Sequence, residues 1–376
     1  MVLPAEQNVP AVLPREPTGQ RCLVVFDMRR LDGQANARLR GGDGPRTRPN
    51  SAESMHVPVT SARGEVTYVR GADPIALGRT TVAEEKCCAT EGHCASIMAR
   101  MPFTIATGSG ELSGWVCGAG PRVLAIHGGP GMSFGYLDDA VAELAAHYQV
   151  ATFQQRGLAP STEQGEFTIA EAVADIAAVL DGLGWDTAYL MGHSWGGHLV
   201  FHAAVGIPER LAGVLSVDPL GAVGDGGAAA FGAEMLARVP EASRDRARAL
   251  DEKDTAGEAT PEETHEAFSL VWGSYFAHPP AAPPMPHVEF SQPANLGLWT
   301  DVRTRLPELE SSLVSITVPF GVLVGELSPM PPSAGVESAE RIPGAWSHIE
   351  PGAGHFVWHE APGCLLAAMD RLVADA

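Results

Sequence analysis

Short apolar runs alternate with amphipathic stretches along the chain from about residue 110 onward. Apolar runs bounded by glycine, proline or polar residues are typical of buried strands, and apolar positions recurring every three or four residues indicate helices. The pattern predicts strands at residues 111–117, 122–127, 149–153, 188–192, 212–218 and 320–325. It predicts helices at residues 136–147, 169–183, 196–205 and 363–373. We therefore expect an α/β fold with a doubly wound, mostly parallel sheet and ligands at the carboxyl ends of its strands.

The strand rhythm stops between residues 220 and 313. Charged helical stretches at 229–238 and 262–272 replace it, followed by the proline-rich segment 279–284. We interpret residues 221–313 as a helical insertion that lies as a cap above the catalytic face. Residues 101–220 and 314–376 would then form the core.

The first hundred residues lack sustained periodicity and are scattered with proline, glycine and arginine. Such a segment cannot bury enough apolar surface to offset the entropy lost on ordering. We expect residues 1–100 to be a mostly disordered extension. An over-extended gene model with a true start at Met98 or Met101 is the alternative.

The net charge of the chain limits the classes of partner that it can bind. The formal charge is −20, and 45% of the residues are hydrophobic, so the chain would repel phosphate backbones and anionic lipid. No apolar run is long enough to span a bilayer, and no signal peptide is evident. We expect a cytoplasmic protein that acts on a small molecule or short peptide, with no nucleic-acid or membrane partner. The sequence does not indicate an oligomeric state.

The cysteines predict neither a disulfide framework nor a metal site. Six cysteines in a chain of this length are too few and too unevenly placed for such a framework, so we expect reduced thiols. Cys87, Cys88, His93 and Cys94 are zinc-ligand types, but they crowd into one short segment instead of forming two separated pairs. We predict no metal and no cofactor.

The strongest chemical signal is Gly192-His193-Ser194-Trp195-Gly196, which fits the G-x-S-x-G nucleophile elbow between a strand and a helix. The glycines are needed because a side chain would clash in so tight a turn. Ser194 is the predicted nucleophile of an α/β-hydrolase fold.

A glycine-rich loop, His127-Gly128-Gly129-Pro130-Gly131, follows the strand at 122–127. Such a loop presents a backbone N–H beside the nucleophile, so Gly129 and Trp195 N–H groups are the expected oxyanion hole. We expect His127 to order this loop.

His355, in a loop before the C-terminal helix, is the predicted general base because the histidine comes last in chain order in this fold. His359 is the less suitable alternative, because it lies at or inside the helix.

Four motifs together resemble the proline iminopeptidase-like branch (peptidase S33 type) of the α/β-hydrolases: HGGPG at 127–131, QQRG at 154–157, GHSWGG at 192–197 and GAGH at 352–355. The resemblance covers residues 101–376. It implies hydrolysis of a peptide, amide or ester in a capped pocket, and it leaves the substrate open.

The chain departs from that family at the triad acid. The family places an Asp three residues after the glycine that ends the strand, and here that residue is Ser328; the family's Asp-Gln-Arg-Gly is also Gln154-Gln155-Arg156-Gly157. Asp218, at the end of the preceding strand, is one candidate acid and Glu326 is another. A weakened dyad without an acid is the third possibility.

The resemblance also implies that cap carboxylates hold a substrate's free amine. Glu234 and Glu266 are the candidates, with Glu262 and Glu263 also available. Trp195, Trp272, Tyr275 and Trp299 either line an apolar pocket or pack in the core. The predicted function is a serine hydrolase, most similar to an aminopeptidase of the proline iminopeptidase type. The alternatives are a small-molecule esterase or lactonase, or a ligand-binding protein that has lost catalysis.

Overall fold

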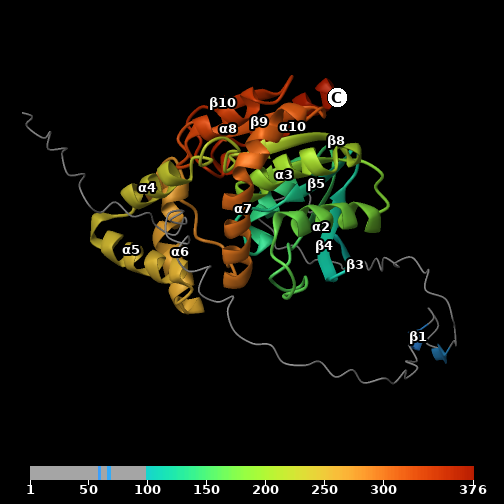
Figure 1. Ribbon diagram of the computed structural model, residues 1–376, viewed down its shortest axis with the longest axis horizontal. Helices are drawn as coiled ribbons and strands as arrows, with labels where there is room; N and C mark the ends of the chain where they lie inside the picture. Colours follow the sequence, from blue (N-terminus) through green and yellow to red (C-terminus); the bar gives the residue numbers. More distant parts are fainter. Residues whose placement is uncertain (1–57, 61–65, 69–98) are drawn as a thin grey trace, which may run out of the picture.

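The computed structural model describes residues 58–60, 66–68 and 99–376 (Figure 1). Its main sheet has eight strands in the order β10-β9-β8-β7-β5-β6-β4-β3. These strands are β3 (Met101–Thr107), β4 (Gly110–Gly118), β5 (Arg122–Ile126), β6 (Gln149–Phe153), β7 (Ala188–His193), β8 (Leu211–Val217), β9 (Phe320–Gly325) and β10 (Trp346–Glu350). A separate antiparallel pair joins β1 (Pro58–Thr60) to β2 (Val66–Tyr68). The extension was predicted for residues 1–100, and apart from β1, β2 and residues 99–100 it lies outside the described residues.

The predicted α/β fold with a mostly parallel sheet is confirmed. Strands β5 to β10 pair in parallel, whereas β3 and β4 are antiparallel to their neighbours. The edge strands β3 and β10 were not predicted. β3 carries Pro102, which lacks an N–H to donate and is tolerated at a sheet edge. β10 is largely exposed, so its sequence lacks an apolar run.

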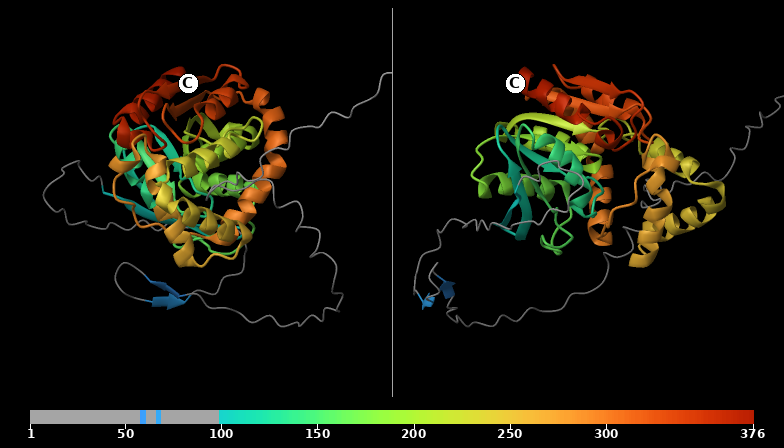
Figure 2. Two further views of the ribbon diagram at one scale, coloured as in Figure 1. Left: turned by 90° about the vertical axis from the view of Figure 1, so that its left-hand side faces the viewer. Right: turned by 180° about the vertical axis from the view of Figure 1, so that it is seen from behind.

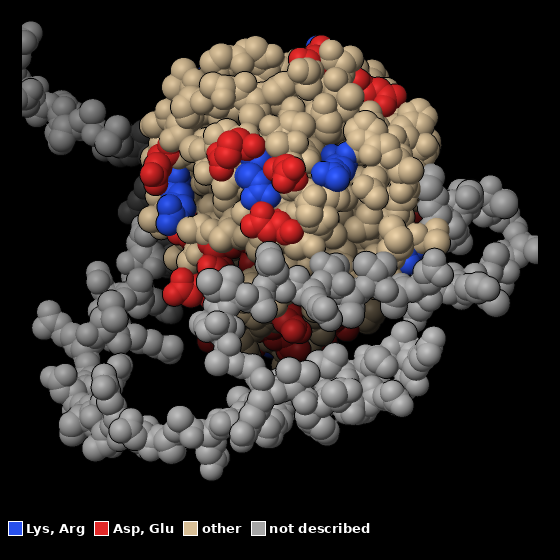
Figure 3. All heavy atoms as spheres, turned by 90° about the vertical axis from the view of Figure 1, so that its right-hand side faces the viewer, with Lys and Arg blue, Asp and Glu red and all other residues tan. Residues whose placement is uncertain are grey.

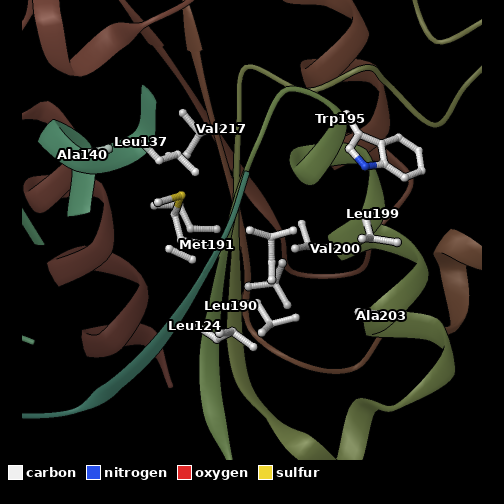
Figure 4. Close-up of a cluster of buried hydrophobic side chains, with 14 of the residues drawn as sticks. Leu124, Leu137, Ala140, Leu190, Met191, Trp195, Leu199, Val200, Ala203 and Val217 are labelled. Atoms are coloured by element: carbon white, nitrogen blue, oxygen red, sulfur yellow. The ribbon is translucent and has the colours of Figure 1, made fainter. Parts of the chain in front are cut away.

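Helices flank the sheet. They are α1 (Asp138–Leu144), α2 (Ile169–Gly182), α3 (Trp195–Gly206), α8 (Pro332–Glu340), α9 (Val357–Glu360) and α10 (Cys364–Asp375), with short 3₁₀ turns η2 (Phe134–Leu137) and η3 (Pro208–Arg210). Figure 4 shows side chains of β5, β7 and β8 packed between α1 on one side and α3 on the other. Leu124, Leu190 and Val200 are fully buried there. This core holds the carboxyl ends of the strands in a fixed arrangement.

The segment between β8 and β9 is helical. It contains α4 (Ala228–Arg238), α5 (Glu241–Ala256), α6 (Pro261–Val271), η4 (Trp272–Tyr275), η5 (Pro279–Ala281), α7 (Gln292–Ser312) and η6 (Leu313–Ser315). In Figures 1 and 2, α4, α5 and α6 group at one end of the molecule. The long helix α7 instead contacts α2 and α3 of the core. We call the α4–η5 segment, residues 228–281, the cap.

On the face drawn in Figure 3, basic side chains lie among acidic ones and form no separate basic patch. A phosphate backbone would find no concentrated positive charge on that face. Among the described residues, no helix has the length and apolar character required to cross a bilayer.

Candidate active site

Ser194 occupies a sharp turn between β7 and α3. Its φ of 57° is rare for a residue with a side chain and costs about 1–3 kcal/mol. A Cβ at Gly192 would lie 2.2 Å from Gly196 O, and a Cβ at Gly196 would lie 2.3 Å from Ile126 O. Only glycine fits at these positions. The Ser194 N–H donates to Val217 O at 2.9 Å, which fixes the turn to the end of β8.

Asp218 and His355 lie together behind this turn. His355 Nδ1 is 2.5 Å from Asp218 Oδ2, and both side chains are buried. Because the carboxylate accepts, His355 carries its proton on Nδ1 and presents the Nε2 lone pair as a base. Glu326, the alternative acid, is exposed, and its Oε2 accepts the N–H of Gly352 at 2.9 Å. The structure therefore places Asp218, and not Glu326, next to His355.

Ser328, at the position where an acid was expected, contacts the same carboxylate. Its hydroxyl lies 2.5 Å from Asp218 Oδ2 and 3.5 Å from His355 Nδ1. The backbone N–H of Gly325 donates to Asp218 Oδ1 at 3.2 Å. The buried carboxylate thus has donors on both oxygens, as a buried charge requires.

The loop at residues 127–131 lies beside Ser194. A Cβ on Gly128 would be 2.7 Å from the Ser194 Cβ. Gly129, with a φ of 61°, and Trp195 both line the pocket that Ser194 lines. Trp195 is the first residue of α3, so its N–H has no acceptor within the helix.

His127 braces this loop. Its Nδ1 is 2.9 Å from Gly128 O, its Nε2 accepts the N–H of Gln155 at 3.0 Å, and burial lowers its pKa to about 4. The ring is therefore neutral and spans the loop and the end of β6. Gln155 also accepts the indole N–H of Trp195 at 3.0 Å. Gln154 both donates to Met132 O and accepts from Phe134 N–H, a pair of contacts that an aspartate could not make.

A hydrogen-bonded chain that the sequence did not reveal links the loop to the base. Gly128 N–H donates to the Tyr136 hydroxyl, which lies 2.9 Å from His193 Nδ1, and His193 Nε2 lies 3.0 Å from His355 O. The carbonyl can only accept, so His193 donates from Nε2 and accepts the Tyr136 proton. Burial holds the pKa of His193 well below its usual range. No motif in the sequence pairs Tyr136 with His193.

These groups open into one cavity of about 90 Å³. It is lined by Gly129, Pro130, Met132, Tyr136, His193, Ser194, Trp195, Leu220, Phe231, Asp254, Thr264, Phe268, Tyr275, Phe290, Asn295, Trp299, Met330, His355 and Phe356. Apolar and aromatic side chains dominate this lining. Of the aromatic residues considered for it, Trp272 does not line the cavity and is buried with its indole N–H on Pro283 O.

The cap supplies a different carboxylate from those expected. Glu234 pairs with Arg238 at 2.8 Å and Glu266 with Arg246, and neither lines the cavity. Asp254 of α5 does line it. Its Oδ1 accepts the Thr264 hydroxyl at 2.9 Å, and burial raises its pKa.

Hydrogen bonds join the cap to the loops that carry Leu327 and His355. Arg238 donates to the carbonyls of Ser274, Phe276 and Leu327. The N–H of His355 donates to Tyr275 O at 2.8 Å. The positions of the cap and of His355 are thus linked. His359 is exposed, and its Nδ1 lies 3.9 Å from an oxygen of Asp139.

No group of three or more metal-ligating side chains occurs within the described residues. The Cys87, Cys88, His93 and Cys94 cluster lies outside them.

Comparison with known proteins identifies the family to which this chain belongs. A model of the alpha/beta hydrolase fold family matches residues 121–362, well over half of the chain. The chain belongs to the α/β-hydrolase fold family. The matched region runs from the start of β5 past His355, so it includes Ser194 and Asp218.

Individual α/β-hydrolase relatives differ in activity. Epoxide hydrolase B of Mycobacterium tuberculosis is 34% identical over 101 residues, which are 26% of this chain and 28% of that protein. The proline iminopeptidase of Mycobacterium smegmatis has a TM-score of 0.50 at 24% identity, covering 72% of this chain and 97% of that one. An enol-lactonase of Burkholderia xenovorans LB400 has a TM-score of 0.51 at 18% identity, covering 72% and 99%. The structural likenesses show the fold, and the sequence match spans under a third of the epoxide hydrolase. The resemblance to the proline iminopeptidase branch therefore stays a prediction.

Proposed function

We propose that the protein is a serine hydrolase that works through an acyl-enzyme. The observation that carries the proposal is the His355–Asp218 hydrogen bond beside a cavity that Ser194 and His355 both line. His355 Nε2 takes the Ser194 proton as the hydroxyl attacks a carbonyl, and Asp218 stabilises the resulting imidazolium. The N–H groups of Gly129 and Trp195 hold the oxyanion, at a few kcal/mol each. The imidazolium returns its proton to the leaving alcohol or amine as the substrate C–O or C–N bond breaks, which leaves the acyl-enzyme. Water, activated by the same histidine, then hydrolyses the ester of Ser194 and releases the acid.

The serine favours an acyl substrate over an epoxide. Attack by the Ser194 hydroxyl on an epoxide would leave an ether, which has no carbonyl that water could attack. Such an adduct would not turn over. An acyl-serine ester does present a carbonyl, so esters, lactones and amides fit this nucleophile.

The cavity lining favours a small, largely apolar ester or lactone. Phe231, Phe268, Phe290 and Trp299 surround the space next to the catalytic groups. Burial of an apolar substrate group against them would stabilise the complex by about 25 cal/mol per Å².

Asp254 supports a second candidate, an aminopeptidase of the proline iminopeptidase type. A carboxylate in an apolar cavity costs free energy unless a cation pairs with it. A substrate's free ammonium group would supply that cation. This single carboxylate takes the place of the Glu234 and Glu266 expected from the sequence.

The first experiment is intact-mass analysis after incubation with a fluorophosphonate. We expect one adduct on the wild type and none on Ser194→Ala. A folded wild-type protein that forms no adduct would contradict a serine hydrolase and favour the ligand-binding alternative.

The second experiment separates the two substrate classes. The rates with p-nitrophenyl butyrate and with proline p-nitroanilide are compared for the wild type, Asp254→Asn and the control Glu234→Gln. For an esterase, the butyrate is preferred and Asp254→Asn leaves its KM unchanged. For an aminopeptidase, the anilide is cleaved and Asp254→Asn raises its KM at least about tenfold, the loss expected for one charge-assisted hydrogen bond.

A further inference from the structure

Ser328 has a hydrogen-bond geometry that fixes the direction of its proton. The N–H of Met330 donates to its Oγ at 3.1 Å, and the Oγ lies 2.5 Å from Asp218 Oδ2. A hydroxyl has one proton to give, and the carboxylate can only accept. The proton therefore points to Asp218. The side chain is buried and does not line the substrate cavity.

We infer that Ser328 is a positioning residue that holds Asp218 Oδ2 against His355. The inference rests on the proposed catalytic roles of Asp218 and His355. Gly325 N–H holds Oδ1 of the carboxylate, and Ser328 holds the oxygen that His355 uses. Without the hydroxyl, one of the three donors to this carboxylate is lost.

The two strand ends converge because β8 and β9 are parallel neighbours. Val217 pairs with Leu323, and Asp218 N–H donates to Leu323 O at 2.7 Å. Asp218 follows β8 directly, and Ser328 follows β9 by three residues. Their side-chain oxygens lie 2.5 Å and 3.5 Å from the same His355 Nδ1.

Two kinetic consequences follow. A carboxylate that loses a donor becomes more basic and stabilises the imidazolium more strongly. In Ser328→Ala the acidic midpoint of the kcat/KM profile should therefore rise by about one pH unit, the shift that corresponds to the loss of one hydrogen bond to a charged group. The plateau kcat should nevertheless fall about tenfold, because Asp218 Oδ2 no longer holds His355 in the orientation that proton transfer from Ser194 requires. KM should stay unchanged, because the hydroxyl does not touch the substrate. Ser328→Thr keeps the hydroxyl and should restore the midpoint.

Proton NMR tests the positioning role without any substrate. The His355 Nδ1 proton should give a far-downfield resonance in the wild type, assigned by its loss in Asp218→Asn. Ser328→Ala should shift it and Ser328→Thr should return it. An unchanged resonance and pH profile in Ser328→Ala would overturn the inference. Absence of fluorophosphonate labelling in a wild type that shows the resonance would instead refute the proposed function alone.

Discussion

Replacement of Asp218 by asparagine should nearly abolish activity, because neither orientation of the amide suits the surrounding donors. With its oxygen toward His355, the amide NH₂ faces the N–H of Gly325, which now donates to Oδ1 at 3.2 Å. With its NH₂ toward His355, the ring must accept at Nδ1 and carry its proton on Nε2. That tautomer cannot take the proton of Ser194.

Three donors converge on this carboxylate, and they set the size of the effect. Two of them, the Ser328 hydroxyl and the His355 ring, lie 2.5 Å from Oδ2, so the orientation that keeps Gly325 paired disrupts both. The wrong tautomer lowers kcat by about 10⁴, which corresponds to about 5 kcal/mol of barrier. We expect this loss in kcat, with KM nearly unchanged, for whichever p-nitrophenyl ester the wild type hydrolyses.

Glu326→Gln is the matched control, because Glu326 was the alternative acid and is exposed. Its activity should stay within about twofold of the wild type, as for surface substitutions generally. Thermal melting checks that both variants are folded. A folded Asp218→Asn enzyme with wild-type kcat, or a large loss in Glu326→Gln, would refute the assignment of Asp218 as the acid.

Three further predictions concern other parts of the fold. Gly128→Ala should lower kcat for ester hydrolysis at least about a hundredfold, because the added Cβ would lie 2.7 Å from both the Ser194 Cβ and the Tyr136 hydroxyl. Gly135→Ala is the control: there is open space around Gly135, so kcat in the same assay should not change. Arg156→Gln should lower the free energy of unfolding, measured by urea denaturation, by about 3–5 kcal/mol, because it leaves the buried Asp175 carboxylate unpaired. In the control Arg248→Gln, which removes an exposed ion pair, the free energy of unfolding should fall by less than about 1 kcal/mol. Burial lowers the pKa of His127 and of His198 from 6.5 to about 4, so the unfolded chain binds more protons below pH 6.5. Their stabilising effect is complete above that pH and is lost as pH falls toward 4, by about 2 kcal/mol for each histidine at pH 5. His198→Asn should flatten this dependence in urea titrations, and an unchanged slope would contradict it.

The interior of the sheet could be predicted from sequence because its strands are apolar on both faces. β5, β7 and β9 are almost entirely buried, and their apolar runs stand out from the surrounding sequence. β10 has three exposed residues of five and therefore lacks this signal. The extra helix α8 escaped notice for a similar reason: its residues are small and mixed in polarity, and it packs on β9 and β10.

The strand ends were equally informative about the catalytic groups. Ser194 and Asp218 each directly follow a strand that the sequence predicts, and the ends of neighbouring parallel strands meet at a common edge. His355 was instead predicted from chain order, because β10, the strand before it, lacks an apolar run. Chain order and strand position are both written in the sequence. The Tyr136–His193 contact is not, because it depends on how the turn at η2 folds back over the site.

The cap residues that line the cavity could not be predicted in the same way, because helix packing positions them and not a shared sheet edge. Helix α5 carries acidic residues at several positions, and nothing in its sequence separates Asp251, which is buried, from Asp254, which lines the cavity. The sequence predicted Glu234 and Glu266 as ligands of a substrate's free amine because they are carboxylates on cap helices. Each instead has an arginine partner within reach on the surface. Pairing on the surface costs little desolvation, whereas a carboxylate facing an apolar cavity keeps its charge only with a cation. Asp254 is therefore the cap position at which a single substitution distinguishes the two proposed substrate classes: it raises the KM of an aminopeptidase substrate and leaves the KM of an ester unchanged.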